Sequence, residues 1–277
     1  MAEQVFSIFI IPENLYLKEG IWYSDNYNQV SYPAEGNDDC FKVEDTSYWF
    51  KHRNQLLHGI IKKYSYGRLL FDIGGGNGAV TNFLCRKGFE VFLVEPGISG
   101  CYNARERGIK NIINSTFENA GFKLGSLNNI GLFDVVEHIE DDQKFMKELF
   151  KITSPGGRIF ITVPAYNFLW SEADIHAGHY RRYSLKSVSK LLENGGYKTI
   201  YSTFFFSFLV PLIYLFRVIP NKIFRNTGNR KIESDHSAES KFVLKVIDSL
   251  CRKEHNLISK GKKIWFGSSI LIVGEKL

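Results

Sequence analysis

The sequence predicts an α/β fold in which a mostly parallel sheet is covered by helices on both faces. Three observations carry this prediction. From residue 67 onward short apolar runs alternate with helical stretches, a glycine-rich turn follows the first run, and an acidic residue ends the second. Buried strands that alternate with helices of about 10 to 15 residues are typical of βαβ units.

Residues 1–46 are aromatic, polar and rich in turn-forming residues, so we expect an irregular N-terminal extension. The next segment, TSYWFKHRNQLLHGIIKKY, places four apolar side chains on one helical stripe: Leu56, Leu57, Ile60 and Ile61. Thr46 or Ser47 suits the N-cap. A helix is therefore expected before the first strand.

The alternating elements follow in order along the chain. We expect strands at RLLFDI, EVFLVEP, KNIINST, NIGLFDVV and RIFITVP, and helices at GAVTNFLCRKG, GISGCYNARERG and DDQKFMKELFKITSPGG. A helix capped by Ser184, the strand KTIYSTFFF and a last strand in SSILIVGEKL complete the pattern. A basic and apolar insertion at about residues 207–263 separates these last two strands.

The charge is concentrated in one late segment. Hydrophobic content of 44% and charged content of 23% are ordinary for a globular protein and exclude global disorder. Residues 217–263 carry 12 Lys and Arg against 5 Asp and Glu, whereas residues 1–216 carry 22 against 23. The net charge of +6 therefore does not indicate a nucleic-acid partner.

The cysteines and the N-terminus bear on the compartment. Cys40, Cys85, Cys101 and Cys251 include no C-x-x-C pair, which argues against a disulfide framework and a zinc site. Glu3 precedes the first apolar run and no basic n-region is present, so no cleaved signal peptide is expected. We expect a cytoplasmic protein, with the inner face of the membrane as an option.

The turn FDIGGGNGAV fits two nucleoside ligands. Gly74, Gly76 and Ala79 fit the G-x-G-x-x-G/A pattern of dinucleotide sites, whereas the same letters from Asp72 fit D-x-G-x-G-x-G. Glu95, at the end of the next strand, suits ribose hydroxyls in either case. A carboxylate at position 72 would be costly beside a pyrophosphate and favourable beside a cationic ligand with an amino acid tail.

The segment GLFDVVEHIEDD, with FDIGGGNG, VEP and SPGGRIFITVP at matching distances, resembles class I S-adenosylmethionine-dependent methyltransferases of the small-molecule type. The resemblance covers about residues 45–277 and implies a Rossmann-like, seven-stranded sheet whose last strand is antiparallel. It implies S-adenosylmethionine as cofactor. By this resemblance the methionine end is lined by Asp72, Gly74, Gly76 and Gly78, the ribose by Glu95, the adenine by Ser115, Thr116 and Phe117, and the methionine side by Phe133 and Asp134. Gly75 departs from the family's more usual cysteine or small residue, and no acidic residue stands at position 115 or 116.

His138 is a candidate base, because an oxygen acceptor must lose its proton during methyl transfer. Asp134, Glu137 and His138 have i, i+3, i+4 spacing and resemble the E-x-x-E-H arrangement of ubiquinone-pathway O-methyltransferases, which can hold a divalent cation. Structural hydrogen bonding is the alternative, and a cation is not expected.

The loop SEADIHAGHYRRYS is the candidate acceptor site. We expect catalysis from His179 and acceptor binding from a second set: His176, Tyr180, Arg181, Arg182 and Tyr183. The two arginines could clamp an anionic group, or one could pair with a structural carboxylate while the tyrosines pack as a lid. The loop resembles an element of bacterial methyltransferases in glycan, lipid and secondary-metabolite pathways.

Two further segments have open roles. Arg53 in YWFKHRN could reach the methionine carboxylate, although helix packing is the more ordinary role of this segment. Residues 203–225 are bulky and apolar with basic flanks, which suits a membrane surface, a cover over the acceptor pocket or a homodimer interface.

The predicted function is S-adenosylmethionine-dependent methyl transfer to a small-molecule, glycan or lipid-linked acceptor, with oxygen favoured as the methylated atom. The alternatives are an NAD-dependent oxidoreductase and a non-catalytic cofactor-binding protein on the same fold. The domain prediction is an extension at 1–46 and one methyltransferase domain at 47–277.

Overall fold

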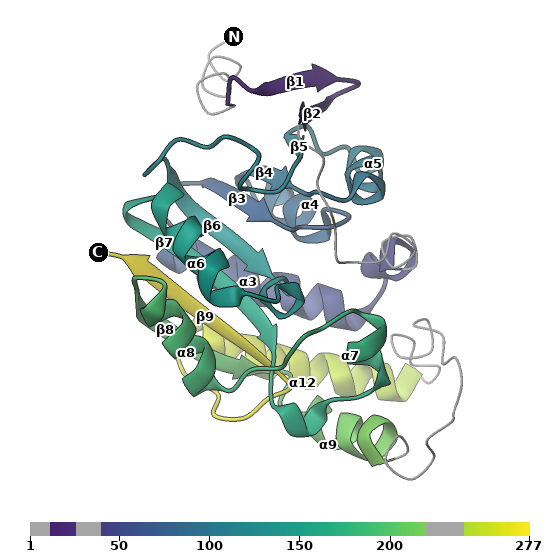
Figure 1. The fold of residues 1–277 in the computed structure, drawn as a ribbon. Helices are drawn as coiled ribbons and strands as arrows, with labels where there is room; N and C mark the ends of the chain where they lie inside the picture. Colours follow the sequence, from purple (N-terminus) through teal and green to yellow (C-terminus); the bar gives the residue numbers. More distant parts are fainter. Residues whose placement is uncertain (1–11, 26–39, 220–240) are drawn as a thin grey trace.

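A computed structural model describes residues 12–25, 40–219 and 241–277, and Figure 1 shows a twisted sheet with helices on both faces. The strands of the described part are ordered β1-β2-β5-β4-β3-β6-β7-β9-β8. Their bounds are β1 Leu15–Lys18, β2 Ile21–Ser24, β3 Leu69–Ile73, β4 Glu90–Val94, β5 Ile112–Asn114, β6 Leu127–Phe133, β7 Thr153–Pro164, β8 Tyr197–Phe205 and β9 Ser269–Lys276.

Helices connect these strands and cover the sheet. The α-helices are α3 Tyr48–Tyr64, α4 Ala79–Arg86, α5 Ile98–Glu106, α6 Asp142–Ile152, α7 Glu172–His176, α8 Leu185–Asn194, α9 Leu209–Ile213 and α12 Lys241–Ser259. Short helical turns lie at η1 Val136–His138, η2 Asn167–Leu169 and η3 Tyr214–Val218. Ser47 and Ser184 cap α3 and α8 as predicted, because each side chain accepts a backbone N–H of the first turn.

The central strands confirm the predicted α/β fold. β5, β4, β3, β6 and β7 are parallel, and β9 pairs antiparallel with both β7 and β8. The strand β4 is apolar at four consecutive positions because helices cover both faces of the sheet. All parallel strands therefore end at one edge, where the glycine turn and the loops after β6 and β7 meet.

The N-terminal extension differs from the irregular chain that we predicted. Residues 15–24 form a hairpin whose turn holds Glu19 and Gly20 at φ 50° and 80°. Its second strand pairs in parallel with β5 through Trp22 and Ile113, and Ile21 is fully buried. With the hairpin, the described sheet has nine strands instead of the expected seven. The hairpin covers the edge of β5 that would otherwise be open.

The predicted insertion is partly described. β8 leads into α9 and η3, and α12 lies alongside α3 in Figure 1; residues 220–240 fall outside the described residues. None of the described helices combines the length and the apolar character needed to cross a membrane. A buried pair joins α12 to α3, with His52 Nε2 2.7 Å from Glu254 Oε2.

Glu254 is the anchor of this segment. Its carboxylate also accepts the backbone N–H groups of Phe206 and Ser207 at 2.8 and 3.1 Å. Burial alone would raise the pKa of Glu254, but the hydrogen bonds from His52 and the two N–H groups outweigh it and lower the pKa. The charge is thus stabilised on three sides where α12, α3 and the end of β8 meet.

We expect Glu254→Ala to lower the free energy of unfolding by about 3 to 5 kcal/mol, because it leaves His52 and two backbone donors buried without an acceptor. Urea unfolding followed by circular dichroism measures this. The control is Asp248→Ala on the same helix, which removes an exposed pair with Arg252 and should cost about 0.5 kcal/mol or less. Equal losses in the two variants would contradict the anchoring role.

Candidate active site

The glycine turn begins directly after β3. Gly74, Gly76 and Gly78 have φ values of 71°, 54° and 73°, in the left-handed region that glycine adopts without steric cost. A Cβ on Gly74 would lie 3.0 Å from Val135, which follows β6. The turn is therefore pressed against the neighbouring strand end, and its backbone rather than its side chains faces the edge of the sheet.

Glu95 ties the turn to the end of β4. Its Oε2 accepts the N–H of Gly76 at 2.9 Å and its Oε1 accepts the N–H of Gly97 at 2.7 Å. Burial raises the pKa of this carboxyl to about 7, although both N–H groups oppose the shift. Each carboxylate oxygen can accept a further hydrogen bond, so the group can also hold two hydroxyls.

Asp72 lies beneath the turn. Its side chain is fully buried, its Oδ2 accepts the hydroxyl of Thr81 at 2.7 Å, and its Oδ1 makes no hydrogen bond to any described residue. Burial raises its pKa to about 6. A Cβ on Gly75 would lie 2.7 Å from Oδ2 and 2.4 Å from Leu93, so this Asp requires the glycine that departs from the family pattern.

Arg53 of α3 reaches the end of β6. It donates to Asp134 Oδ2, and its guanidinium lies 4.8 Å from the ring centre of Trp49 and 5.1 Å from that of Phe50. Asp134 has φ 60° and also accepts the Thr162 hydroxyl at 3.0 Å. The positive charge of Arg53 also partly offsets the effect of burial on the pKa of Asp72. The guanidinium therefore acts on carboxylates at the ends of both β3 and β6.

The expected adenine and methionine-side residues are mostly interior. Ser115 is fully buried and its hydroxyl has no hydrogen-bond partner among the described residues, and Thr116 Oγ1 accepts the N–H of Asn119 at 3.3 Å. Phe117 packs edge-on against Phe145 with ring centres 5.1 Å apart. Phe133 is buried against the other face of the sheet. The two phenylalanines are thus buried in two different hydrophobic clusters of the core.

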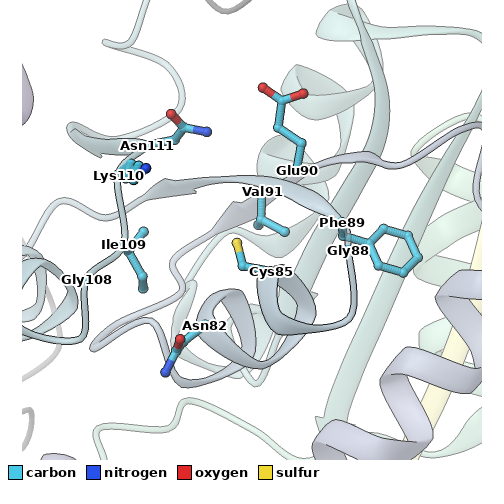
Figure 2. Close-up of a pocket in the computed structure, with 10 residues that line it drawn as sticks. All are labelled: Asn82, Cys85, Gly88, Phe89, Glu90, Val91, Gly108, Ile109, Lys110 and Asn111. Atoms are coloured by element: carbon cyan, nitrogen blue, oxygen red, sulfur yellow. The ribbon is translucent and has the colours of Figure 1, made fainter. Parts of the chain in front are cut away.

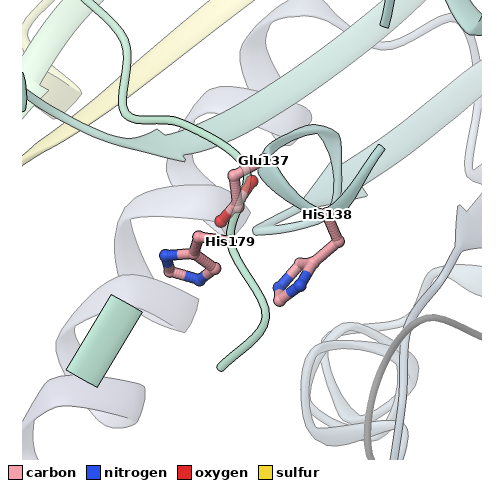
Figure 3. Close-up of side chains that lie close together, drawn as sticks. All are labelled: Glu137, His138 and His179. Carbon is pink, nitrogen blue, oxygen red and sulfur yellow. The ribbon is translucent and has the colours of Figure 1, made fainter. Parts of the chain in front are cut away.

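Glu137, His138 and His179 gather at one place, as Figure 3 shows. One ligand-type atom from each lies within 4.8 Å of the others, and the two imidazole ring centres are 4.7 Å apart. Burial and the nearby Asp134 carboxylate raise the pKa of Glu137 well above its ordinary value. Burial and the neighbouring His179 lower the pKa of His138 to about 4. Asp134, which we expected beside Glu137 and His138, instead pairs with Arg53.

Asp174, which is not among the site residues predicted from the sequence, orients His179. Asp174 Oδ1 lies 2.8 Å from His179 Nδ1 and 2.7 Å from Arg182 Nε. Burial alone would raise the pKa of Asp174, but the hydrogen bonds from His179 and Arg182 lower it to about 2. The only local signal is the capping box of α7, in which Ser171 and Asp174 bond reciprocally.

The remaining acceptor candidates divide into two groups. Arg182 pairs with Asp174, and Arg181 Nη1 lies 2.9 Å from Asp142 Oδ2, so both arginines already neutralise protein carboxylates. Tyr183 is buried and donates to Asp142 at 2.8 Å. His176 and Tyr180 are exposed, with His176 Nδ1 2.9 Å from the Glu172 carbonyl. In this structure the arginines therefore pair with carboxylates of the protein, which is the alternative to an anion clamp given above.

Two cavities differ in their position on the sheet. One, of about 740 Å³, lies between Cys85 at the end of α4 and Glu90 at the start of β4, on the edge opposite the glycine turn. Figure 2 shows the residues that line it. A second, of about 790 Å³, lies beside Phe168, Arg181 and Tyr183, at the edge where β7 ends. Ligands of parallel sheets bind at the carboxyl edge, so only the second adjoins the candidate site.

Comparison with known sequences identifies one family. A family model described as a methyltransferase domain matches residues 49–202. A ubiquinone biosynthesis O-methyltransferase of Pectobacterium carotovorum subsp. carotovorum is 27% identical over 150 residues, which cover 50% of this chain. The match spans 61% of the length of that relative.

Solved structures show the same fold. A SAM-dependent methyltransferase of Thermotoga maritima superposes with a TM-score of 0.53 at 16% identity, covering 88% of this chain and 96% of that one. Phosphoethanolamine N-methyltransferase 2 of Haemonchus contortus, in complex with S-adenosyl-L-methionine, gives 0.54 at 17% identity, covering 90% and 58%. These likenesses confirm the class I arrangement of the sheet.

We expect Asp72→Asn to stabilise the protein at pH 8 by about 3 kcal/mol, since a buried pKa raised by about two units costs about 1.4 kcal/mol per unit once the group ionises. The folded pKa exceeds the ordinary value, so the stability of the native Asp is complete below pH 4 and is lost as pH rises through 6. Chemical unfolding at pH 4 and pH 8 checks this, with the exposed Asp248→Asn as control. An equal gain at both pH values would sink the idea.

Proposed function

This chain belongs to the methyltransferase domain family, and from that premise we propose that it methylates a hydroxyl oxygen of a small-molecule, glycan or lipid-linked acceptor. It is an S-adenosylmethionine-dependent enzyme. The family match and the antiparallel β9 remove the support for an NAD-dependent oxidoreductase, whose second half would continue with parallel strands. We assign residues 47–277 to one catalytic domain with the insertion at about 207–263.

The residues at the carboxyl edge fit the cofactor. The glycine turn forms a cradle that a Cβ would fill, and buried oxygens of Asp72 and Ser115 lack a hydrogen-bond partner within the described chain. When bound, S-adenosylmethionine supplies an electrophilic methyl group. We assign its ribose hydroxyls to Glu95, its methionine end to the turn with Arg53 and Asp134, and its adenine surroundings to residues 115–116.

The hydrogen bond between Asp174 and His179 carries the preference for oxygen. The low pKa of Asp174 keeps it ionised at neutral pH, so it can only accept, and His179 Nδ1 must carry the proton that it donates. In the neutral imidazole with this tautomer, the other ring nitrogen, Nε2, carries the lone pair. A positioned imidazole of this kind can take the proton of an acceptor hydroxyl, whereas an amine acceptor needs no such base.

His138 and Glu137 have different roles from His179 in this proposal. A pKa of about 4 makes His138 a weak proton acceptor at neutral pH, so we assign it to packing and hydrogen bonding beside the acceptor. The raised pKa of Glu137 favours its protonated form, which can donate a hydrogen bond. The exposed Tyr180 and His176 remain available for the acceptor, while the two arginines hold the loop in place.

Transfer of a labelled methyl group tests the proposal. The enzyme is incubated with S-adenosylmethionine carrying a ¹³C methyl and with the metabolite, glycan and lipid fractions of its source cells. An acceptor that gains one methylene unit by mass, with the ¹³C chemical shift of a methyl ether or ester, supports the proposal. A shift typical of an N-methyl group would overturn it. Calorimetry with S-adenosylhomocysteine and NAD separately checks the cofactor.

We expect His179→Ala to lower kcat by about 100- to 10,000-fold, the range in which a general base contributes, with little change in the affinity for S-adenosylhomocysteine. His138→Ala should lower kcat much less, because its pKa is too low for the task. Initial rates with the identified acceptor measure both. A larger loss from His138→Ala than from His179→Ala would reverse the two assignments.

Asp174→Asn should also lower kcat, by about 10- to 100-fold, because it removes the acceptor that fixes the tautomer of His179. The matched control is Asp142→Asn, whose carboxylate pairs with Arg181 and Tyr183 in the same region without contacting a histidine. The pH–rate profile separates orientation from packing, since only Asp174→Asn should move its acidic limb.

We expect kcat in excess EDTA to stay within about twofold of kcat without EDTA. The carboxylate of Asp134 is bound to Arg53, which leaves Glu137, His138 and His179 as a three-group set, whereas the oxygen-binding cations prefer six or more ligands. A loss of activity that Mg²⁺ or Mn²⁺ restores would instead assign a metal to this cluster.

A further inference from the structure

Exposed apolar side chains gather beyond the candidate site, on three segments. We call this surface the aromatic platform and define it by six residues: Phe168, Leu212, Tyr214, Leu215, Trp265 and Phe266. Trp265 is 81% exposed and Leu215 54% exposed, so both side chains project outward and do not line a groove. Apolar side chains that gather in one exposed patch mark an interaction site, because covering them removes apolar surface from water.

Ring contacts join the three segments into one surface. The ring of Tyr166 stacks on Phe168 at 5.2 Å and on Phe204 at 5.3 Å, and lies 5.4 Å from Phe266. Phe168 also meets Tyr214 edge-on at 6.2 Å. Tyr166 has φ 60°, a strained value for a bulky side chain, and this backbone holds its ring among the others. The platform is therefore a supported surface and not a set of independent side chains.

The platform lies at the same edge of the sheet as the candidate site. β7 ends at Pro164 and β8 at Phe205, and both of these residues are in register with Ser269, the first residue of β9. The three platform segments follow β7, follow β8 and precede β9. In Figure 1, α7 and α9 lie together at this end of the molecule. Whatever covers the platform is thus at the same edge of the sheet as Asp134 and His179.

Exposed lysines border the platform beside Trp265. Lys260, Lys262 and Lys263 are exposed and lie two to five positions before Trp265. Residues 205–219 and 255–268 contain no Asp or Glu. Neighbouring exposed lysines and a protruding tryptophan suit the boundary of a bilayer, where the ring enters the headgroup region and the ammonium groups remain with lipid phosphates.

We infer that the aromatic platform binds the surface of a membrane that contains anionic phospholipid. A protein partner would be expected to offer pockets for Trp265 and Leu215, and a neutral surface would give no role to the lysines. The contact is peripheral in this inference, with Trp265, Tyr214 and the two leucines at the acyl boundary. Its link to catalysis, delivery of a hydrophobic or lipid-linked acceptor to the active edge, rests on the proposed function; the binding itself does not.

Vesicle flotation tests the inference with the full chain. Vesicles of phosphatidylcholine alone are compared with vesicles that contain phosphatidylglycerol as well, at low and at high salt. Wild type should float with the anionic vesicles and should dissociate partly in high salt. The double variant Leu215→Ser with Trp265→Ser, and the double variant Lys262→Glu with Lys263→Glu, should each lower the bound fraction by about tenfold.

A matched control uses the opposite edge of the sheet. Lys123 and Leu124 are adjacent and exposed in the loop before β6, with Leu124 77% exposed. The double variant Lys123→Glu with Leu124→Ser changes the same residue types and should bind vesicles as wild type does. Thermal unfolding and S-adenosylhomocysteine binding, unchanged in all variants, show that the fold is intact.

Several outcomes overturn the inference. Failure to recover wild type with anionic vesicles at low salt contradicts it, and so does a Leu215 and Trp265 variant that floats as well as wild type. Sedimentation that shows a dimer which this variant dissociates would assign the platform to a second copy of the chain. An assay of methyl transfer to a detergent-dispersed acceptor keeps the two proposals separate. Vesicle binding without methylation of an oxygen refutes only the proposed function. Methylation of an oxygen without vesicle binding refutes only the membrane contact.

Discussion

Four strands leave the same edge of the sheet through residues with left-handed backbone, and the site depends on this constraint. Gly74 directly follows β3, Asp134 directly follows β6, Tyr166 comes two residues after β7 and Phe206 directly follows β8, with φ values of 71°, 60°, 60° and 57°. Only the first is glycine, and each of the others costs about 1 to 2 kcal/mol relative to ordinary backbone. Each turn bends the chain back across the edge instead of letting it run on, which brings the loops together above the sheet.

Helix α3 supplies much of the support that offsets this strain. Its Arg53 bonds to Asp134, and its Trp49 stacks on Phe206 with ring centres 5.4 Å apart. Its His52 contacts the same phenylalanine and binds Glu254 of the insertion. A helix that precedes the central strands in the sequence therefore holds two strand ends and the late insertion in place, which explains why its polar residues His52 and Arg53 are buried.

The features predicted from sequence are those set by neighbouring residues. The strand and helix alternation, the turn at Gly74, the acid at Glu95 and the cap at Ser184 each follow from periodicity or from the conformational preference of one residue. Two pairs that support the site join distant residues: Arg53 and Asp134 are 81 positions apart, and His52 and Glu254 are 202 apart. Neither pair leaves a local pattern. The same holds for Arg181 and Arg182, whose adjacency suggested a clamp but whose partners, Asp142 and Asp174, are fixed only by the fold.

The position of β9 has a consequence for biogenesis. β9 lies between β7 and β8, and β8 pairs with no other strand in the described sheet. As the chain emerges from a ribosome, β7 must wait with an unpaired edge until residues 269–276 have been made. Such an edge is open to pairing with other chains. The half of the sheet that contains β7, β9 and β8 can form only after this strand has been translated. The same holds for the support beneath the loops that follow β7 and β8. Chains released early would therefore expose an aggregation-prone surface.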